Sequence, residues 1–115
     1  MKKLLQIPLL LVALFLTSIP ISAHDFEVDG IFYNILSDST VEVTYKGSEY
    51  SSYNEYSGSI SIPSTVTYNS TIYTITSIGD DAFRKSGLSS IDISQSVVKI
   101  GSGAFFYCRL LETIN

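Results

Sequence analysis

The 115-residue sequence contains one cysteine, one histidine and no tryptophan. A single cysteine cannot form an internal disulfide, which excludes a small scaffold held together by disulfides. A Ser-His-Asp triad needs a histidine inside the fold, whereas the only histidine, His24, directly follows an apolar N-terminal segment. The sequence also lacks a glycine-rich phosphate loop and any cluster of cysteine and histidine with metal-ligand spacing. We therefore predict no catalytic residues, no metal site and no cofactor, and we do not expect an enzyme.

The N-terminal segment has the three parts of a secretory signal peptide. Met1-Lys2-Lys3 is basic, an unbroken apolar run extends over residues 9–16, and Ala23 offers a small residue for cleavage. The apolar run is shorter than the roughly 20 residues that a transmembrane helix needs, so we expect no stable membrane insertion after cleavage. We predict that residues 1–23 are a signal peptide and that the mature chain, starting at His24, is secreted or displayed on the cell surface.

Basic residues are scarce in the remaining chain. Loss of the signal peptide removes Lys2 and Lys3 and leaves five basic residues against eleven acidic ones, a net charge of −6. A protein that binds nucleic acid through phosphate contacts needs a basic face. We therefore predict no nucleic-acid partner.

Two similar units follow one another in the C-terminal third of the chain. The segment IGDDAF at 78–83 returns as IGSGAF at 100–105, which is 22 residues later, and LSSID at 88–92 reappears as LETIN at 111–115, which is 23 residues later. The same apolar and glycine residues recur while the spacing between the copies changes by one residue, which indicates a repeated supersecondary unit. This pattern predicts a solenoid, in which each unit buries its apolar side against the next.

Each unit predicts a short strand, a turn and a short compact segment. Apolar residues two apart at Ile91 and Ile93 fit a strand with one buried face. We expect Gly101 to let the backbone turn through positive φ, and Ala104-Phe105 to close one short helical turn. Stacking would place Phe83 over Phe105, with Ile78 over Ile100 and Ile91 over Ile114. The predicted repeat core is Ile78, Ala82, Phe83, Leu88, Ile91, Ile93, Ile100, Ala104, Phe105, Cys108, Leu111 and Ile114.

These motifs resemble a known family. The order L-x-x-I-x-I, a serine-rich break, V-x-x-I-G-x-x-A-F and C-x-x-L resembles the BspA-type leucine-rich repeat, over residues 59–115. The first copy departs from this pattern, because Ser86 stands where Cys108 stands in the second and the segment from Phe83 to Leu88 is one residue shorter. The resemblance implies a β-rich α/β solenoid, a leucine-rich repeat stack of parallel strands with short helical turns. It also implies a bacterial surface or secreted protein that takes part in adhesion to host or matrix proteins or to neighbouring cells. We expect its partner to be a protein, from the host, the matrix or another cell surface, or a glycan.

Residues 24–58 differ from the repeats and predict an N-terminal β cap followed by a polar loop. Strands at 26–28 and 31–35 flank Asp29-Gly30, a dipeptide suited to a two-residue hairpin turn. Alternating apolar residues at 41–45 predict a third strand, which completes a β-hairpin or meander. We expect this meander to cover the first inner face of the stack, which would otherwise meet water.

Tyrosines recur at every third position of the polar loop at 46–58. They could form an aromatic surface for a ligand, or they could lie over the cap in a solvated loop, which is the simpler interpretation. Two further tyrosines lie within an insertion in the first repeat, at 67–75. The candidate binding residues are Tyr50, Tyr53, Tyr56, Tyr68 and Tyr73.

The first and last repeats are irregular. Residues 60–62 match a later repeat strand and end at Pro63, whereas the nine extra residues at 67–75 predict a hairpin that projects from the stack. Asn69-Ser70-Thr71 matches the N-glycosylation pattern, which we interpret as chance. Asn115 falls inside a repeat strand, so we expect the last repeat to be incomplete and the chain to be an N-terminal fragment of a longer array.

Other residues with chemical potential have simpler interpretations. His24 could bind copper as a new N-terminal residue, but oxidative enzymes of that kind need a second histidine. Cys108 is more consistent with a buried small apolar residue than with a nucleophile. Asp80 and Asp81 could bind calcium, but the second copy has Ser102-Gly103 at these positions, which favours turn residues in water.

Three functional hypotheses follow from the sequence. The first is a secreted or cell-surface module that binds a protein or a glycan. The second is a structural fragment of a longer surface protein, without independent activity. The third is a surface enzyme that would use two carboxylates such as Glu42 and Glu49 on a glycan, although a thin stack offers little room for a pocket. We favour the first hypothesis from the site chemistry.

Overall fold

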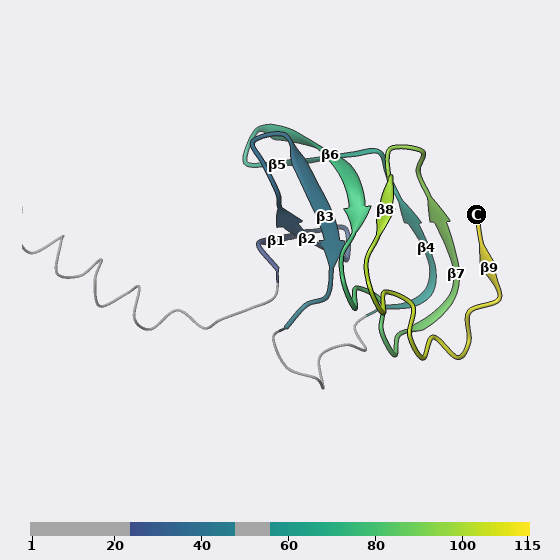
Figure 1. The fold of residues 1–115 in the computed structure, drawn as a ribbon. Helices are drawn as coiled ribbons and strands as arrows, with labels where there is room; N and C mark the ends of the chain where they lie inside the picture. The colour runs from purple at the N-terminus through teal and green to yellow at the C-terminus, as the bar shows by residue number, and fades with distance from the viewer. Residues whose placement is uncertain (1–23, 48–55) are drawn as a thin grey trace, which may run out of the picture.

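The computed structural model describes residues 24–47 and 56–115, and the predicted signal peptide lies outside them (Figure 1). The described residues form strands joined by turns. They are β1 (Phe26–Val28), β2 (Ile31–Ile35), β3 (Thr40–Thr44), β4 (Ser57–Ile62), β5 (Thr65–Tyr68), β6 (Thr71–Ile78), β7 (Gly87–Ile93), β8 (Lys99–Ile100) and β9 (Thr113–Ile114).

Two sheets enclose one interior. The first sheet has the order β1-β2-β3-β6-β5, and β8 also pairs with β6. The second sheet has the order β4-β7-β9, with every pair parallel. The chain alternates between the sheets, so that β3 leads to β4, β6 to β7 and β8 to β9 (Figure 1). These three pairs of strands are successive coils of a solenoid, called the first, second and third coil below.

The register of the strands explains the drift in the spacing of the repeats. In the first sheet Ile78 pairs with Ile100, which is 22 residues later, whereas in the second sheet Ile91 pairs with Ile114, which is 23 residues later. Cys108 still follows the shorter spacing, because its Sγ lies 3.5 Å from Oγ of Ser86. The extra residue of the third coil therefore lies between Cys108 and the last strand.

Aromatic rings form a column through the interior, one from the cap and one from each coil. Phe32 lies 5.6 Å from Tyr56, and Tyr56 lies 4.7 Å from Phe83, between ring centroids. Phe83 stacks on Phe105 at 5.5 Å with an interplanar angle of 15°. This contact confirms the prediction that Phe83 and Phe105 are neighbours in successive coils.

Most of the predicted repeat core faces this interior. Ile93, Phe105, Cys108 and Leu111 are partly buried against it, whereas Ile78, Ala82, Phe83, Leu88, Ile91 and Ala104 are buried.

Ile100 and Ile114 were predicted in the interior as well, and this prediction is wrong, because they are 51% and 53% exposed. They pair with Ile78 and Ile91 as expected, but they belong to the third coil, and no described segment lies over them.

The turns at 79–86 and 101–108 do not form the expected helical turns, and residues 24–47 and 56–115 contain no helix. Asp81 and Lys85 adopt positive φ angles of 58° and 59°, and Gly103 and Tyr107 repeat these conformations in the third coil. A left-handed residue at every fourth position interrupts a helix. It also aims backbone donors at the next coil, as in the 2.8 Å bond from Phe83 N to the carbonyl of Ala104.

The cap joins the stack directly through β3. Asp29 and Gly30 both have positive φ, as a two-residue hairpin turn of type I′ requires, and β1, β2 and β3 are antiparallel. The opposite edge of β3 pairs in parallel with β6. One strand therefore ends the meander and begins the first coil.

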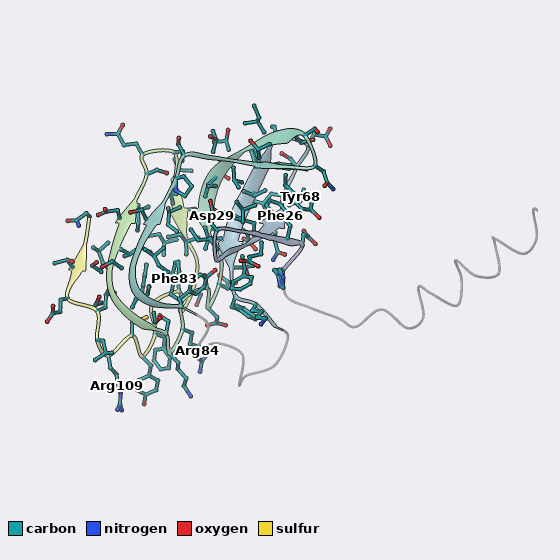
Figure 2. The ribbon with its side chains drawn as sticks, turned by 180° about the vertical axis from the view of Figure 1, so that it is seen from behind. Phe26, Asp29, Tyr68, Phe83, Arg84 and Arg109 are labelled. Carbon is teal, nitrogen blue, oxygen red and sulfur yellow. The ribbon has the colours of Figure 1, made fainter. Side chains whose placement is uncertain are left out.

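The insertion in the first repeat does form a hairpin, but it does not project from the stack. Asn69 and Ser70 make its turn with positive φ, and β6 lies within the first sheet between β3 and β5. Tyr68 at the end of β5 stacks on Phe26 of the cap at 4.2 Å (Figure 2). This aromatic contact holds the hairpin against the cap.

Gly101 is required for close approach between coils. It does not adopt the positive φ that we expected from the sequence. A Cβ atom at this position would lie 2.6 Å from the backbone nitrogen of Asp80 and 2.8 Å from the carbonyl carbon of Gly79. Both atoms belong to the backbone of the second coil, so neither can move without distorting the stack.

We expect Gly101→Ala to lower the free energy of unfolding by about 1–3 kcal/mol, the usual cost of overpacking. Gly87→Ala is the matched control, because its nearest contact would be an ordinary 3.6 Å to Cβ of Ser57. The control should change stability by less than about 0.5 kcal/mol. Urea unfolding followed by circular dichroism measures both, and equal effects of the two substitutions would contradict the close-approach explanation.

Candidate binding surfaces

The solvent-facing side of the second sheet carries only short polar side chains at its outward positions. We call these residues the polar face: Ser59, Ser61, Ser90, Asp92, Thr113 and Asn115. They face outward because side chains alternate along a strand while their neighbours, such as Ile60 and Ile91, face the interior. The polar face therefore spans all three coils.

Hydrogen bonds link the polar face from coil to coil. Oγ of Ser59 lies 2.7 Å from Oγ of Ser90. Asp92 accepts bonds from both neighbouring coils, at 3.4 Å from Oγ of Ser61 and 2.8 Å from Nδ2 of Asn115. These contacts order the side chains and leave hydroxyl, amide and carboxylate groups available to a polar partner. We did not predict these residues as a surface from the sequence. The alternation of polar residues with isoleucine along the strands could have indicated it.

Tyr56 is not part of a ligand surface, and the prediction that it binds a ligand is wrong. It is buried, and its hydroxyl donates a 2.6 Å hydrogen bond to the carbonyl of Thr44. The same hydroxyl accepts a 3.0 Å bond from the backbone nitrogen of Phe32. Tyr56 thus joins the cap to the first coil. Tyr50 and Tyr53 lie outside the described residues.

The other two candidate tyrosines pack against the cap. Tyr68 and Tyr73 are partly buried, with ring centroids 4.2 Å and 5.8 Å from that of Phe26. Both retain some exposure to solvent. They form an aromatic cluster on the hairpin side of the first sheet, and they do not join the polar face.

A hollow of about 560 Å³ separates the cap from β4, and we call it the edge groove. Asp29 and Tyr33 contribute to its wall on the cap side, and Ser59, Ile60 and Ser61 contribute from β4. Burial raises the pKa of Tyr33 to about 12, and the nearby Asp29 carboxylate adds to the increase. Neutral Tyr33 is thus the form that the fold stabilises.

A second hollow of about 570 Å³ lies on the outer side of the first sheet and contains Glu42. Asn34 donates a 3.3 Å hydrogen bond to the Glu42 carboxylate, and Lys99 and Asp80 also line the hollow. Oδ1 of Asp80 accepts a 2.8 Å bond from Ser102 N and thereby supports the turn. Glu49, the other carboxylate of the enzyme hypothesis, lies outside the described residues.

Basic and aromatic side chains gather along the turns of the second and third coils. Arg84 lies 4.9 Å above the Phe106 ring, and Lys85 and Arg109 lie 5.8 Å and 5.4 Å from the Tyr107 ring. Figure 2 shows Arg84 and Arg109 at this edge. The contacts of Arg84 and Lys85 join the second coil to the third and thus support the stacked turns, whereas the contact of Arg109 lies within the third coil.

The remaining candidates have structural contacts. The Cys108 thiol donates a 2.9 Å bond to the carbonyl of Phe83, which links two coils. Asp81 forms an ion pair with Arg84 at 3.5 Å. His24 contacts the carbonyl of Lys46 and the ring edge of Phe32. Residues 24–47 and 56–115 contain no group of three or more histidine, cysteine, aspartate or glutamate side chains arranged to hold a metal.

Comparison with known proteins decides the family. The family model for the BspA type leucine-rich repeat region (6 copies) matches residues 29–115. The chain belongs to this family. The match begins within the cap, earlier than the resemblance at 59–115 suggested, and the parallel pairing of β3 with β6 gives the structural reason. No curated protein matches the chain.

Solved structures of bacterial leucine-rich repeat proteins are similar to this repeat protein. A protein from Bacteroides ovatus is 35% identical, with a TM-score of 0.67 over 80% of this chain and 23% of that chain. A leucine-rich cell surface protein from Faecalibacterium prausnitzii is 29% identical, with a TM-score of 0.62 over 86% of this chain and 24% of that chain. A protein from Bacteroides capillosus is 26% identical, with a TM-score of 0.64, and the match covers 78% of this chain and 63% of that chain.

No helix in the described part of this repeat protein is long and apolar enough to cross a membrane.

We expect the stability of the fold to fall between about pH 10 and pH 12. In the unfolded chain the Tyr33 hydroxyl ionises near its ordinary pKa of 10.0, whereas in the folded chain its pKa is about 12. The favourable contribution of neutral Tyr33 is fully present below pH 10 and is lost as the pH rises through the folded value. Unfolding midpoints measured across this range test the expectation, with Tyr33→Phe as the comparison. A variant with the same pH dependence as the unmodified chain would contradict it.

Proposed function

We propose that this repeat protein is a secreted or cell-surface binding module whose polar face contacts a protein or a glycan. Membership in the BspA-type leucine-rich repeat family supports a binding role, and one similar structure is that of a cell surface protein. The observation that carries the proposal is the polar face itself. Its side chains are ordered by bonds between coils, such as those that Asp92 accepts from Ser61 and Asn115.

The chemistry of the polar face favours a polar partner. Its outward positions hold hydroxyl and amide groups and the carboxylate of Asp92, without an apolar side chain among them. On binding, such groups replace their hydrogen bonds to water by hydrogen bonds to the partner. These bonds form only when donors and acceptors of the two molecules are matched in position, which provides specificity. The interior is already filled by the aromatic column, so the outward positions are those at which the sequence can vary without loss of the fold.

The proposal includes delivery to the outside of the cell by residues 1–23. The basic start, the apolar run and the small residue Ala23 support a cleaved signal peptide. N-terminal sequencing of the exported protein tests this step, and we expect a sequence beginning at His24. Substitution of Ala23 by a bulky residue, Ala23→Phe, should block this cleavage. Retention of Met1 in mature wild-type protein would contradict the proposal.

We expect Ser90→Arg to weaken binding by at least about tenfold, because a long charged side chain would stand in the middle of the polar face. Ser39→Arg is the matched control, since Ser39 is an exposed loop residue between β2 and β3. The measurement is surface plasmon resonance against a panel of immobilised matrix proteins and glycans, with thermal unfolding to check that both variants fold. Absence of any partner for the wild type, or equal loss in both variants, would contradict the proposed face.

A further inference from the structure

The cap covers the first edge of one sheet and not of the other. In the first sheet β2 pairs with β3, and β1 continues the cap. In the second sheet β4 is the first strand of the order β4-β7-β9, and within residues 24–47 and 56–115 it pairs with β7 alone. Unpaired N–H and C=O groups on a strand edge are a template for the addition of another strand.

The hydrogen bonds of β7 indicate which backbone groups of β4 are unpaired. Ile91 and Ile93 bond toward the last strand, through Asn115 N to the Ile91 carbonyl at 2.9 Å and Ile93 N to the Asn115 carbonyl at 2.8 Å. Backbone groups alternate in direction along a strand, so Ser90 and Asp92 bond toward β4. Because Ile60 pairs with Ile91, Ile60 is the residue of β4 that bonds toward β7.

The N–H and C=O groups of Ser59 and Ser61 therefore point away from β7, toward the free edge. Pro63 directly follows β4 and has no N–H, as is usual for proline at a sheet edge, and its carbonyl accepts a 3.1 Å bond from Oγ of Ser94.

The edge groove lies along these backbone groups. Its lining contains Ser59, Ile60, Ser61 and Pro63 from the β4 segment and Thr65, Val66 and Thr67 from β5. The β1–β2 hairpin supplies the opposite wall, including Val28 and Ile31. Asp29, labelled in Figure 2, belongs to the turn of this hairpin and also lines the groove. The groove thus combines an open strand edge, apolar walls and a carboxylate.

We propose that the edge groove binds an extended peptide, which pairs with β4 as an added strand and places a basic side chain at Asp29. Strand addition matches the unpaired backbone groups of Ser59 and Ser61, and the apolar walls provide contacts for alternate side chains. The volume of the hollow is within the usual range of ligand sites. A basic peptide complements Asp29 and the acidic chain, which has eleven acidic against seven basic residues. A second copy of the chain would carry the same negative charge, which disfavours pairing of two β4 edges.

This site is separate from the central part of the polar face, and its test does not depend on the function proposed above. The probes are fluorescent peptides of six residues, the length of β4, with alternating valine and threonine and with lysine, glutamine or glutamate at the third position. Fluorescence anisotropy with the purified protein measures their affinities. We expect the lysine peptide to bind about tenfold more tightly than the glutamate peptide, with the glutamine peptide between them.

Two substitutions in the protein separate charge from strand pairing. Asp29→Asn should remove the preference for lysine while keeping the left-handed turn, since asparagine tolerates positive φ. Asp38→Asn, at an exposed loop residue, is its matched control and should retain the preference. Ser61→Pro removes an N–H that faces the free edge and should weaken all three peptides by about tenfold. It keeps the backbone bonds to β7 and loses only the side-chain bond from Ser61 to Asp92.

Two N-methylated lysine peptides keep the test decisive even if Ser61→Pro fails to fold. Methylation of the N–H groups on the side that faces β4 should abolish binding, and methylation of the alternate N–H groups should not. Absence of saturable binding by the lysine peptide would overturn the proposal. Equal binding of the two methylated peptides would also overturn it, as would light scattering that shows a dimer which competes with the peptide. Thr113→Arg, on the polar face but separated from β4 by β7, should leave peptide binding unchanged, so failure at the edge groove is distinguishable from failure at the polar face.

Discussion

Stacking of aromatic rings between successive coils is the interaction on which the rest of the structure depends. Tyr56 and Phe83 each lie between rings of neighbouring layers, whereas Phe105 contacts Phe83 on one side and is only partly buried. Burial of one ring contributes about 1.5–3 kcal/mol. Each coil therefore obtains much of its stability from its neighbours, as expected for a repeat protein with contacts between adjacent units.

The same stacking imposes conditions on the backbone. Gly101 brings two turns so close that no Cβ fits, and left-handed residues such as Asp81 and Lys85 free donors for the next coil. Bonds such as that from Phe83 N to the carbonyl of Ala104 then continue the ladder through the turn. The extra residue of the third coil is tolerated because it lies after Cys108 and before the strand pairing resumes at Thr113. The repeat conserves contacts and not a fixed number of residues.

The sequence was sufficient to predict the contacts that recur, but not those that occur once. Phe83 and Phe105 could be paired because the same motif surrounds both, and Asp29-Gly30 marked its turn through local chemistry. Tyr56 could not be distinguished from its neighbouring tyrosines, since its burial depends on Thr44 and Phe32, which are distant in sequence. The role of Gly101 was misjudged because close approach between coils requires the same residue type as a left-handed turn. The polar face needed the strand register before its residues could be seen as one surface.

The edge groove arises where the repeat is interrupted. The insertion lets β5 turn away from β4 and pair with β6 in the first sheet, so β5 does not cover the second sheet. The stacking of Tyr68 on Phe26 then holds this hairpin against the cap, and the hollow is left between the cap and the edge of β4. A regular coil would pass from one sheet to the next by a short connection, as Ile93 passes to Lys99 in the second coil. The repeat thus builds the stable interior, and its irregular first coil creates a surface that no other described coil has.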